Sequence, residues 1–570
     1  MLKFDTNVQE LKYKVLKEVA KSAFKGSLLE DYNDIPKTVV PGPKPTMRCC
    51  IYKERAIVNE RIKLALGGNK DINNVVEVIN IACDECPLGG YEVTNRCRGC
   101  IAHRCEKACR RNAITFDPKT RMAHIEKTSC VNCGMCAKAC QYNAIQNFQR
   151  PCEQACKVKA ISMGEDYAAK IDDNKCVQCG ACVYQCPFGA IMDKSSIVDV
   201  INLIKESDYS KKFPIYAVVA PSISAQFKYA TLGQIVTAIK KLGFHSVVEA
   251  ALGADMVSYT EAKELEEKQF LTSSCCPTFV SYIKKCYPKL AEHISHNLSP
   301  MATIAKHIKE ITPEAKIIFV GPCISKKQEI KDERVRPYVD YVLTFEELQA
   351  LIDSQDIDAS TLEESVLDNA SYYGRIFART GGLADAVKQA LKEQNSSFEV
   401  KPLVCDGLDN CKLGLIKAMS PSRDFNFIEG MGCVNGCIGG PCCLTHEFKD
   451  KTEVDKYGKE AKEKGTNTIV VSDNVFKFLE NYDFNVVSLD EETLTEGTLN
   501  SIRNNFKKEN YNTILVLDNN YTDNINSIIN DYKAKAIDVK SMINVDSDNT
   551  DDYLTVMQDL IDNIRNICLN

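Results

Sequence analysis

The feature that most constrains this chain is a cysteine pattern that repeats within its first third. "CVNCGMCAKACQYNAI" (130–145) and "CVQCGACVYQCPFGAI" (176–191) share the spacing C-x2-C-x2-C-x3-C-x3-A-I. "CRGCIAHRCEKACRRNAI" (97–114) and the shorter "CEQACKVKAI" (152–161) end in the same way. Eighteen of the 29 cysteines precede residue 190. In a reducing compartment such density favours metal ligation over disulfides, and a segment this poor in apolar runs depends on its metal centres to fold.

The repeated spacing is that of the bacterial ferredoxin run, in which the fourth cysteine binds the other cluster of a pair. Four half-units therefore predict two ferredoxin-like modules with exchanged fourth ligands. Three 4Fe–4S sets follow: Cys97, Cys100, Cys105 and Cys140; Cys130, Cys133, Cys136 and Cys109; and Cys176, Cys179, Cys182 and Cys156. The remaining cysteines can hold a fourth cluster: Cys83, Cys86, Cys152 and Cys186. Structural zinc is the alternative, but zinc sites use two separated pairs rather than an even triplet with a distant fourth ligand.

The rest of the chain predicts an α/β and α+β multidomain protein. From about residue 205, short apolar runs such as "FPIYAVVAP", "SVVEA", "KQFLTSS" and "AKIIFVGP" read as buried strands, and helical patterns lie between them. The length of 570 residues suits several domains. We expect a helical segment over 1–80, ferredoxin-like modules over 81–200, a two-lobed α/β catalytic domain over 205–455 and a small α/β accessory domain over 464–570.

Charge and hydropathy exclude some classes of function. The net charge of −6 implies no nucleic-acid partner. No apolar run approaches the roughly 20 residues that span a bilayer, so no membrane partner is expected. The first 24 residues read as an amphipathic helix rather than a signal peptide. A cytoplasmic location follows as an expectation, and thiols stay reduced there.

Three later segments carry cysteines: "LTSSCCPTFV" (271–280), "VGPCISKKQE" (320–329) and "EGMGCVNGCIGGPCC" (429–443). Loops that follow strands in an α/β layer converge, so their thiolates can bind one more cubane. The i, i+4 spacing of Cys433 and Cys437 predicts one face of a helical turn, and the glycines around them predict room for a bulky group. Because adjacent residues point in different directions, one thiol of the pair Cys275–Cys276 can bind metal while its neighbour faces a separate cavity.

These three segments resemble, in order, the three signature motifs of the iron-only (FeFe) hydrogenases. The resemblance spans roughly residues 80–450, and the cysteine-rich start and "GPC" in place of "MPC" are similar to the group B branch. The resemblance implies an H-cluster, a 4Fe–4S cubane bridged through one cysteine to a diiron unit that carries CO, cyanide and a dithiolate amine. By motif, the cubane ligands are Cys276, Cys323, Cys433 and Cys437, with Cys437 as the bridge.

The same resemblance implies roles around the diiron unit. Cys275 would pass protons to the bridging amine, and Lys326 would donate a hydrogen bond to a cyanide. Ser222, in "APSIS", would lie near the other cyanide, and Met431 near the bridging carbonyl.

A proton route also follows from the resemblance. It runs from solvent through Glu264, Ser295, Glu261 and a water to Cys275. Such a relay needs groups within hydrogen-bond reach and pKa values near the working pH. The alternative is that Glu261 and Glu264 are solvated acids on a helix surface.

The implied function is the reversible reduction of protons to molecular hydrogen. Ferredoxin would supply electrons through three to four accessory 4Fe–4S clusters, and maturation proteins would deliver the diiron unit. Several positions depart from the family pattern, among them Gly321 where methionine is usual and Ala378 where glycine is usual. Two alternatives stay open, a hydrogen-sensing regulator of low turnover and an iron–sulfur assembly protein without the diiron unit.

Overall fold

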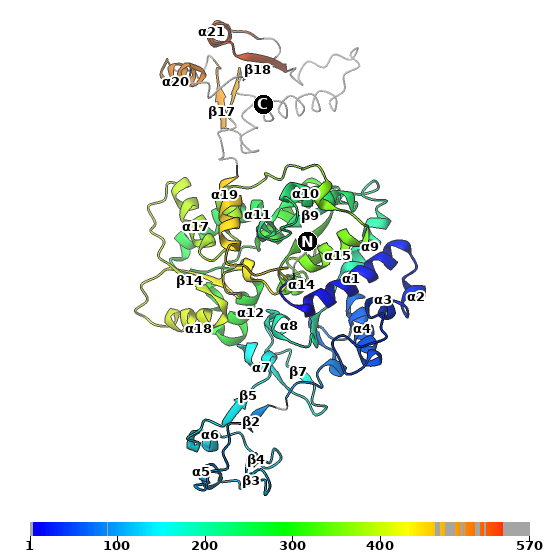
Figure 1. Ribbon diagram of the computed structural model, residues 1–570. Coiled ribbons are helices and arrows are strands. Elements are labelled where there is room, and N and C mark those ends of the chain that lie inside the picture. Colours follow the sequence, from blue (N-terminus) through cyan, green and yellow to red (C-terminus); the bar gives the residue numbers. More distant parts are fainter. Residues whose placement is uncertain are drawn as a thin grey trace. The chain divides into compact units, whose positions relative to one another are not determined.

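The computed structural model describes residues 4–87, 89–461, 468–472, 485–490, 494, 496–507, 513–517 and 520–539. The chain divides into two compact units, Met1–Ala461 and Lys462–Asn570 (Figure 1). None of the helices in these described ranges is long and apolar enough to cross a membrane.

The chain begins with helices that pack into the first unit. They are α1 (Asn7–Lys25), α2 (Leu28–Asp31), α3 (Ile35–Val39) and α4 (Ile51–Ala65). The Thr6 side chain caps the start of α1, and Gly26 ends it in a left-handed conformation with φ of 82°. The apolar face of α1 lies in one core with α9 (Ile197–Glu206) and α15 (Phe345–Ser354). The amphipathic start of the chain is therefore an integral part of the first unit.

The cysteine-rich segment consists of short elements. Its strands are β1 (Val76–Val78), β2 (Gly90–Val93), β3 (Ile114–Phe116), β4 (Ala123–Ile125), β5 (Ile145–Phe148), β6 (Ile161–Met163), β7 (Ala169–Ile171) and β8 (Ile191–Asp193). They form four antiparallel pairs: β1–β8, β2–β5, β3–β4 and β6–β7. One-turn helices lie between them, and each carries one cysteine: α5 (Arg104–Lys107), α6 (Met135–Ala139), α7 (Pro151–Ala155) and α8 (Ala181–Gln185).

Two parallel sheets form the remainder of the first unit, as the alternation of strand and helix patterns predicts. One has the order β10 (Ser246–Glu249), β9 (Ile215–Val219), β12 (Lys316–Gly321), β13 (Tyr341–Thr344). The other has the order β11 (Leu271–Thr272), β15 (Phe427–Met431), β14 (Pro402–Asp406). The accompanying helices are α10 (Leu232–Lys241), α11 (Ala250–Lys268), α12 (Pro277–Cys286), α13 (Pro300–Ile311), α14 (Ile324–Glu329), α16 (Tyr372–Ile376), α17 (Gly382–Glu393), α18 (Gly407–Ala418) and α19 (Asp450–Lys459).

A buried ion network joins distant parts of this unit. Lys12 of α1 contacts Asp193, at the end of β8, and Glu346 of α15, each at 2.5 Å. Lys327 of α14 contacts the same Asp193 at 2.8 Å and Glu347 at 2.9 Å. Burial alone would raise the pKa of Asp193, but Lys12 and Lys327 hold it far below its ordinary value. The carboxylate is therefore charged, and it fixes the N-terminal helix, the module end and α14 together.

The second unit has one parallel sheet in its described residues, as expected for an α/β accessory domain. Its order is β17 (Asn485–Ser488), β16 (Thr468–Val471), β18 (Thr513–Leu517), β19 (Lys535–Val539). The helices α20 (Glu496–Lys507) and α21 (Asp523–Tyr532) contribute to its apolar core.

Candidate active site

The cysteines of the three remote segments lie at the carboxyl ends of strands. Cys276 follows β11 and begins α12, Cys323 follows β12, and Cys433 follows β15. Cys276 and Cys437 lie close enough to Cys323 for their charges to raise the pKa of its thiol. Cys276, Cys323 and Cys437 have the same effect on Cys433. The four sulfurs are thus neighbours within one site, where strands from both sheets end.

The four thiols of this site combine partial exposure with a largely buried environment. Cys276, Cys323, Cys433 and Cys437 keep partial surface access, yet burial raises the pKa of Cys437 to about 11 and that of Cys433 well above its ordinary value. The backbone N–H of Gly432 donates to Cys276 Sγ at 3.4 Å. Four neighbouring soft sulfur donors fit an iron–sulfur cluster, whose binding would deprotonate them.

Two expectations about the third segment are wrong. Cys433 and Cys437 are not on an α-helical turn: Asn435 and Gly436 between them have φ of 66° and 79°, and a 3-10 turn begins only at Cys437. A left-handed pair reverses the chain, so both sulfurs reach the site from a loop. The glycines also do not leave space for a bulky group. A Cβ on Gly436 would meet the Ala378 carbonyl oxygen at 2.8 Å, and one on Gly440 the Pro322 oxygen at 2.7 Å. Neighbouring backbone fills that space.

Cys275 is more deeply buried than its neighbour Cys276. It belongs to a buried apolar cluster with Phe377 and Met431, and only 9% of it is exposed. Burial raises the pKa of the Cys275 thiol far above its ordinary range, and the charges of Cys276 and Glu261 add to this effect. The thiol is therefore protonated unless a base removes its proton.

Glu261 lies in the interior, not on a solvated surface. It is 0% exposed on α11, and neither carboxylate oxygen has a hydrogen-bond partner within the described residues. Burial raises its pKa to about 8, and the nearby Ser295 hydroxyl acts in the opposite direction. Such a carboxyl exchanges protons near neutral pH.

Ser295 and Glu264 continue from Glu261 toward the surface. The Ser295 hydroxyl donates to Glu264 Oε2 at 2.9 Å. Glu264 also pairs with Lys268 at 2.8 Å and accepts from the backbone of His296, whose side chain is 77% exposed. Burial opposes ionisation of Glu264, but Lys268 and these donors lower its pKa. The structure thus brings together the four groups that the sequence predicts for a relay.

The other predicted residues lie around the same site. Lys326 Nζ is 3.4 Å from the Cys275 carbonyl oxygen and 2.6 Å from Glu329. Burial acts to lower the pKa of Lys326, but Glu329 outweighs it, so the ammonium stays charged. The Ser222 hydroxyl is fully buried without a hydrogen-bond partner in the described residues. A buried polar atom left alone is costly, so Ser222 fits a site that receives a polar group.

Sequence reasoning missed two carboxylates. Glu329 is one helical turn after Lys326, and that i, i+3 spacing was the available signal. Glu429 lies inside the apolar strand β15, where a single acid is unusual. Its oxygens accept from the backbone of Gly381 and Ala384 at 2.7 and 2.8 Å, at the start of α17. Burial raises its pKa to about 7.

Glu429 supports the loop that contacts Cys437. The chain at 378–381 leads into α17, and its Ala378 carbonyl accepts from the backbone N–H of Cys437 at 2.8 Å. Glu429 also acts electrostatically on Cys437 and Cys275. It is therefore a positioning residue for the third segment.

The ferredoxin-like modules group their cysteines as the exchanged pattern predicts. Cys140 and Cys100 lie close enough to Cys105 for their charges to raise the pKa of its thiol. Cys130 and Cys109 do the same to Cys136. A cavity of about 330 Å³ has all four cysteines of the second set in its lining: Cys109, Cys130, Cys133 and Cys136.

The remaining eight cysteines form two further groups. In the first group, Cys179, Cys176 and Cys156 lie close enough to Cys182 for their charges to raise the pKa of its thiol. In the second group, burial raises the pKa of Cys152 to about 12, and the charges of the neighbouring Cys186, Cys86 and Cys83 act in the same direction. These neighbours correspond to the third and fourth predicted sets.

The C-x3-A-I ending has a structural purpose in all four half-units. The backbone N–H of the alanine donates to the sulfur of the fourth cysteine, at 3.1–3.4 Å: Ala113 to Cys109, Ala144 to Cys140, Ala160 to Cys156 and Ala190 to Cys186. Such bonds stabilise a thiolate and tune the potential of the cluster that it binds.

Neighbouring sets are also close to one another. Cys152 acts on Cys182, which connects the fourth set to the third. Cys179 acts on Cys433, which connects the third set to the candidate active site. The fourth set, the third set and the remote cysteines thus form a series.

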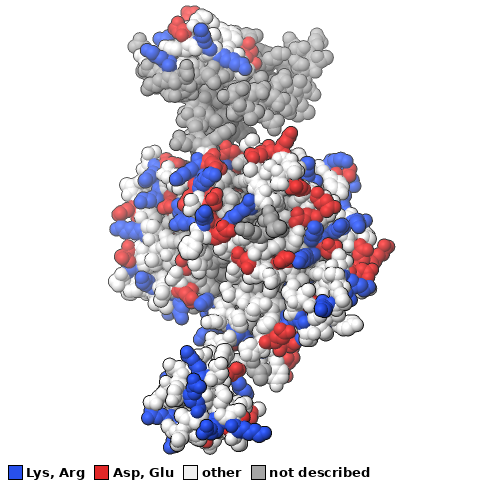
Figure 2. All heavy atoms as spheres, viewed as in Figure 1, with Lys and Arg blue, Asp and Glu red and all other residues white. Residues whose placement is uncertain are grey.

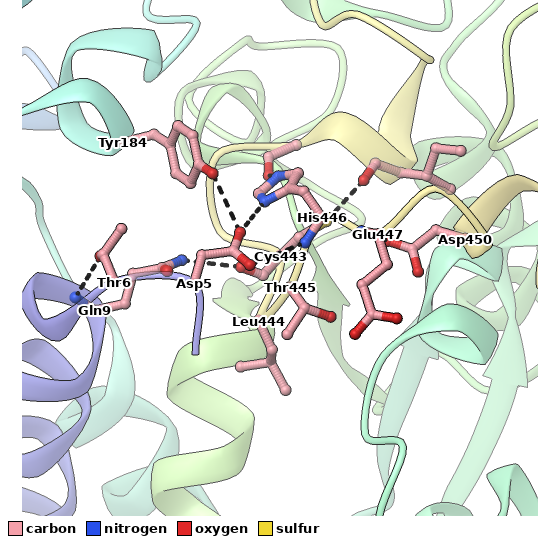
Figure 3. Close-up of polar contacts among 12 residues, drawn as sticks. Asp5, Thr6, Gln9, Tyr184, Cys443, Leu444, Thr445, His446, Glu447 and Asp450 are labelled. Atoms are coloured by element: carbon pink, nitrogen blue, oxygen red, sulfur yellow. Dashed lines mark hydrogen bonds and ion pairs between the residues drawn. The ribbon is translucent and has the colours of Figure 1, made fainter. Parts of the chain in front are cut away.

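The N-terminal segment covers the stretch that follows the third motif (Figure 3). Asp5 pairs with His446 Nδ1 at 2.5 Å and accepts from the Tyr184 hydroxyl at 3.1 Å, while His446 Nε2 lies 2.9 Å from the Gly440 carbonyl. Gln9 donates to the Cys443 carbonyl at 3.0 Å. These contacts hold the loop after Cys437 against α1 and α8.

A family model described as the iron only hydrogenase large subunit, C-terminal domain, matches residues 213–441. The chain carries an iron-only hydrogenase domain. Two further models match the segment before it, a 4Fe-4S dicluster domain over 96–144 and a 4Fe-4S binding domain over 169–192. The iron-only hydrogenase domain thus follows 4Fe–4S binding domains in this chain.

Relatives of more than one kind are similar to this chain. Iron hydrogenase 1 of Clostridium pasteurianum is 28% identical over 60% of this chain and 68% of its own length. A probable cytosolic Fe-S cluster assembly factor of Brugia malayi is 26% identical over 35% of this chain and 55% of its own. A solved apo [FeFe]-hydrogenase from Chlamydomonas reinhardtii is 18% identical with a TM-score of 0.38, over 45% of this chain and 87% of that one.

Proposed function

We propose that the protein is an FeFe-hydrogenase that reversibly reduces protons to molecular hydrogen. The accessory cysteine sets would hold 4Fe–4S clusters, which would supply electron transfer from ferredoxin or a similar redox carrier, and Cys276, Cys323, Cys433 and Cys437 would hold an H-cluster. When bound, the H-cluster supplies the redox chemistry at iron. The observation that carries the proposal is the buried Cys275 thiol beside these ligands, with Glu261 behind it, whose carboxylate oxygens have no hydrogen-bond partner among the described residues.

The chain's own residues hold the cofactor and move protons. Cys437 is the proposed bridge to the diiron unit, with Ser222, Lys326 and Met431 around that unit. Protons enter at Glu264, next to exposed His296, and pass over Ser295 to Glu261. Glu261 is protonated over much of the neutral range because its pKa is about 8, and it supplies the proton that Cys275 holds. The buried surroundings exclude bulk water, which keeps proton delivery on this route.

Maturation proteins that deliver the diiron unit and a cytoplasmic location belong to the same proposal. A reducing compartment suits so many thiols. The group B branch stays a prediction from the sequence.

The second candidate is an iron–sulfur assembly protein without a diiron unit, favoured by the relatives named as assembly factors. A hydrogen sensor of low turnover is a variant of the first proposal and is motivated by Gly321. A Cβ there would meet the Phe319 ring at 2.7 Å, so the methionine usual in the family has no room at this position.

Infrared spectroscopy distinguishes these candidates. The holoprotein is produced anaerobically with hydrogenase maturation proteins, and the control is the same protein produced without them. The proposal expects CO and cyanide bands in the first sample alone. Full iron content without these bands would favour the assembly protein, and bands with hydrogen turnover near background would favour the sensor.

A further inference from the structure

The outer cysteine-rich module has the opposite charge to the chain as a whole. Residues 90–148 contain ten lysines and arginines against four aspartates and glutamates, a net charge of +6, whereas the chain has −6. Figure 2 shows lysine and arginine side chains gathered on this module. A local excess of this size attracts an acidic partner at long range.

The excess is greatest around the first cysteine set. Arg96, Arg98 and Arg104 lie in its loop, and Arg121 lies against Gly99 of that loop. The corresponding triplets at 130–136 and 176–182 contain no lysine or arginine. The charge is therefore a property of this loop and not of the repeat.

These four arginines are exposed and free to meet a partner. The ion pairs within residues 90–148, all of them described, are His103–Glu106 and Lys127–Glu92. None of the four arginines takes part in an ion pair with any described residue. An unpaired surface charge needs no internal contact broken before it binds another protein.

The same loop carries an apolar tip. It has two more residues between its second and third cysteines than the other triplets, and the first of these, Ile101, is 100% exposed. Arg98 and Arg104 flank it in the sequence. A small apolar centre with a charged rim is typical of protein interfaces, and electron-transfer interfaces are at the small end of their range.

This loop is at the far end of the module from its connection to the rest of the unit. Arg150 ties the connection by donating to the Pro87 carbonyl at 3.0 Å. There β2 and β5 pair at Gly90 and Phe148, and both lead away from it to Val93 and Ile145, the ends nearest Cys97 and Cys140. The second set stays near the connection, because Asn132 contacts the backbone of Tyr91.

We propose that the face formed by Arg96, Arg98, Ile101, Arg104 and Arg121 docks a small acidic electron-carrier protein, which delivers its electrons to the cluster on Cys97, Cys100, Cys105 and Cys140. In each encounter the reduced carrier loses one electron and the cluster gains it. Two encounters supply the electrons for one hydrogen molecule. The inference rests on the proposed function, because it names the docking surface and the entry point of that electron route.

The test uses the mature holoprotein with a reduced, acidic two-cluster ferredoxin as the probe. The variant is Arg98→Glu/Arg121→Glu, and the matched control is Lys240→Glu/Lys241→Glu, which reverses two exposed charges at the end of α10. We expect the KM for ferredoxin to rise about tenfold or more in the variant and less than about twofold in the control. In the wild-type protein KM should also rise with salt, because screening weakens the attraction. Unchanged KM in the variant, or a salt-independent KM in the wild type, overturns the proposal.

Two measurements distinguish a docking defect from loss of the cluster or of the catalytic site. Iron content and methyl viologen-linked activity should stay at wild-type levels in Arg98→Glu/Arg121→Glu; if iron is lost, Ile101→Asp provides the same KM comparison. If the protein evolves no hydrogen even with viologen, the proposed function fails, but the Kd of ferredoxin for the iron–sulfur-loaded protein still tests the docking face. Tighter binding of a 20-base-pair DNA duplex than of ferredoxin would overturn the acidic-protein partner.

Discussion

The cysteines of residues 83–190 and those of residues 276–437 are brought together by different means. In the modules, three cysteines of each triplet come from one short loop, and the alanine four residues after the fourth cysteine donates to its sulfur. In the candidate active site, the four cysteines come from three segments up to 161 residues apart, and two sheets place them. Each of the first three sets therefore needs its triplet loop and one cysteine from a neighbouring half-unit, whereas the remote set needs the whole unit.

Removal of one ligand from each kind of set gives the largest expected difference. Cys276→Ala should abolish viologen-linked hydrogen activity, because the cubane loses one of its four ligands. Cys105→Ala should lose about four iron atoms from its own module and keep that activity. Iron analysis and a viologen assay measure both. Equal loss of activity in the two variants would contradict the division between local and remote sets.

The free thiol of the remote site comes next. Cys275→Ala should lower activity by about 10²- to 10⁴-fold while iron content stays unchanged, because the thiol carries protons and binds no metal. Cys443→Ala is the control, since Cys443 is also buried but lies outside the proposed relay. Full activity of Cys275→Ala would defeat the relay, and loss of iron would make Cys275 a ligand.

Dependence of the remote site on the whole unit is tested at Lys12. Lys12→Met leaves Asp193 and Glu346 buried with one fewer cation, so the free energy of unfolding should fall by about 3–5 kcal/mol. Lys14→Met, on the same helix, breaks only the exposed pair with Glu10 and should change it by less than about 0.5 kcal/mol. Urea unfolding of the two variants gives the comparison. A similar small change in both would mean that the network is not a structural tie.

The smallest effect is expected from the pH dependence of Glu261. Its pKa is about 8 in the folded protein, above its ordinary value of 4.5, so the folded state binds the proton more tightly. Stability should therefore fall as pH rises from 4.5 through 8. Glu261→Gln removes this slope and should be more stable than the wild type at pH 9, with lower activity.

Glu267→Gln, at an exposed position of the same helix, is the control for this measurement. It should keep the wild-type pH slope. An unchanged slope in Glu261→Gln would mean that this carboxyl is not the group that titrates.

The sequence allowed much of the fold to be predicted, because local patterns carry it. Short apolar runs identified β9, β10, β11 and β12, and cysteine spacing anticipated which sulfurs are neighbours, including the exchange of Cys109 and Cys140. Metal ligation by these groups stays a prediction. Spacing did not reveal the turn at Asn435–Gly436, because i, i+4 cysteines fit a helix and a left-handed loop equally well.

Contacts between distant segments were beyond reach for a physical reason. In the sequence, Lys12 reads as an ordinary residue on the polar face of an amphipathic helix. Only the fold reveals that it contacts Asp193 and Glu346 in the interior. Glu429 stands in a short apolar strand, and its partners Gly381 and Ala384 are about 45 residues away. Neither case leaves a periodic pattern in the sequence.

The contacts of the N-terminal segment set an order of events during synthesis. Asp5 and Gln9 leave the ribosome first, but their partners His446 and Cys443 are more than 430 residues later. The loops at 83–190 can close on their own iron while the rest of the chain is still being made. The site at 276–437 gains the contacts of the N-terminal segment only after translation has passed residue 446, so we expect a finished unit to acquire the proposed cofactor.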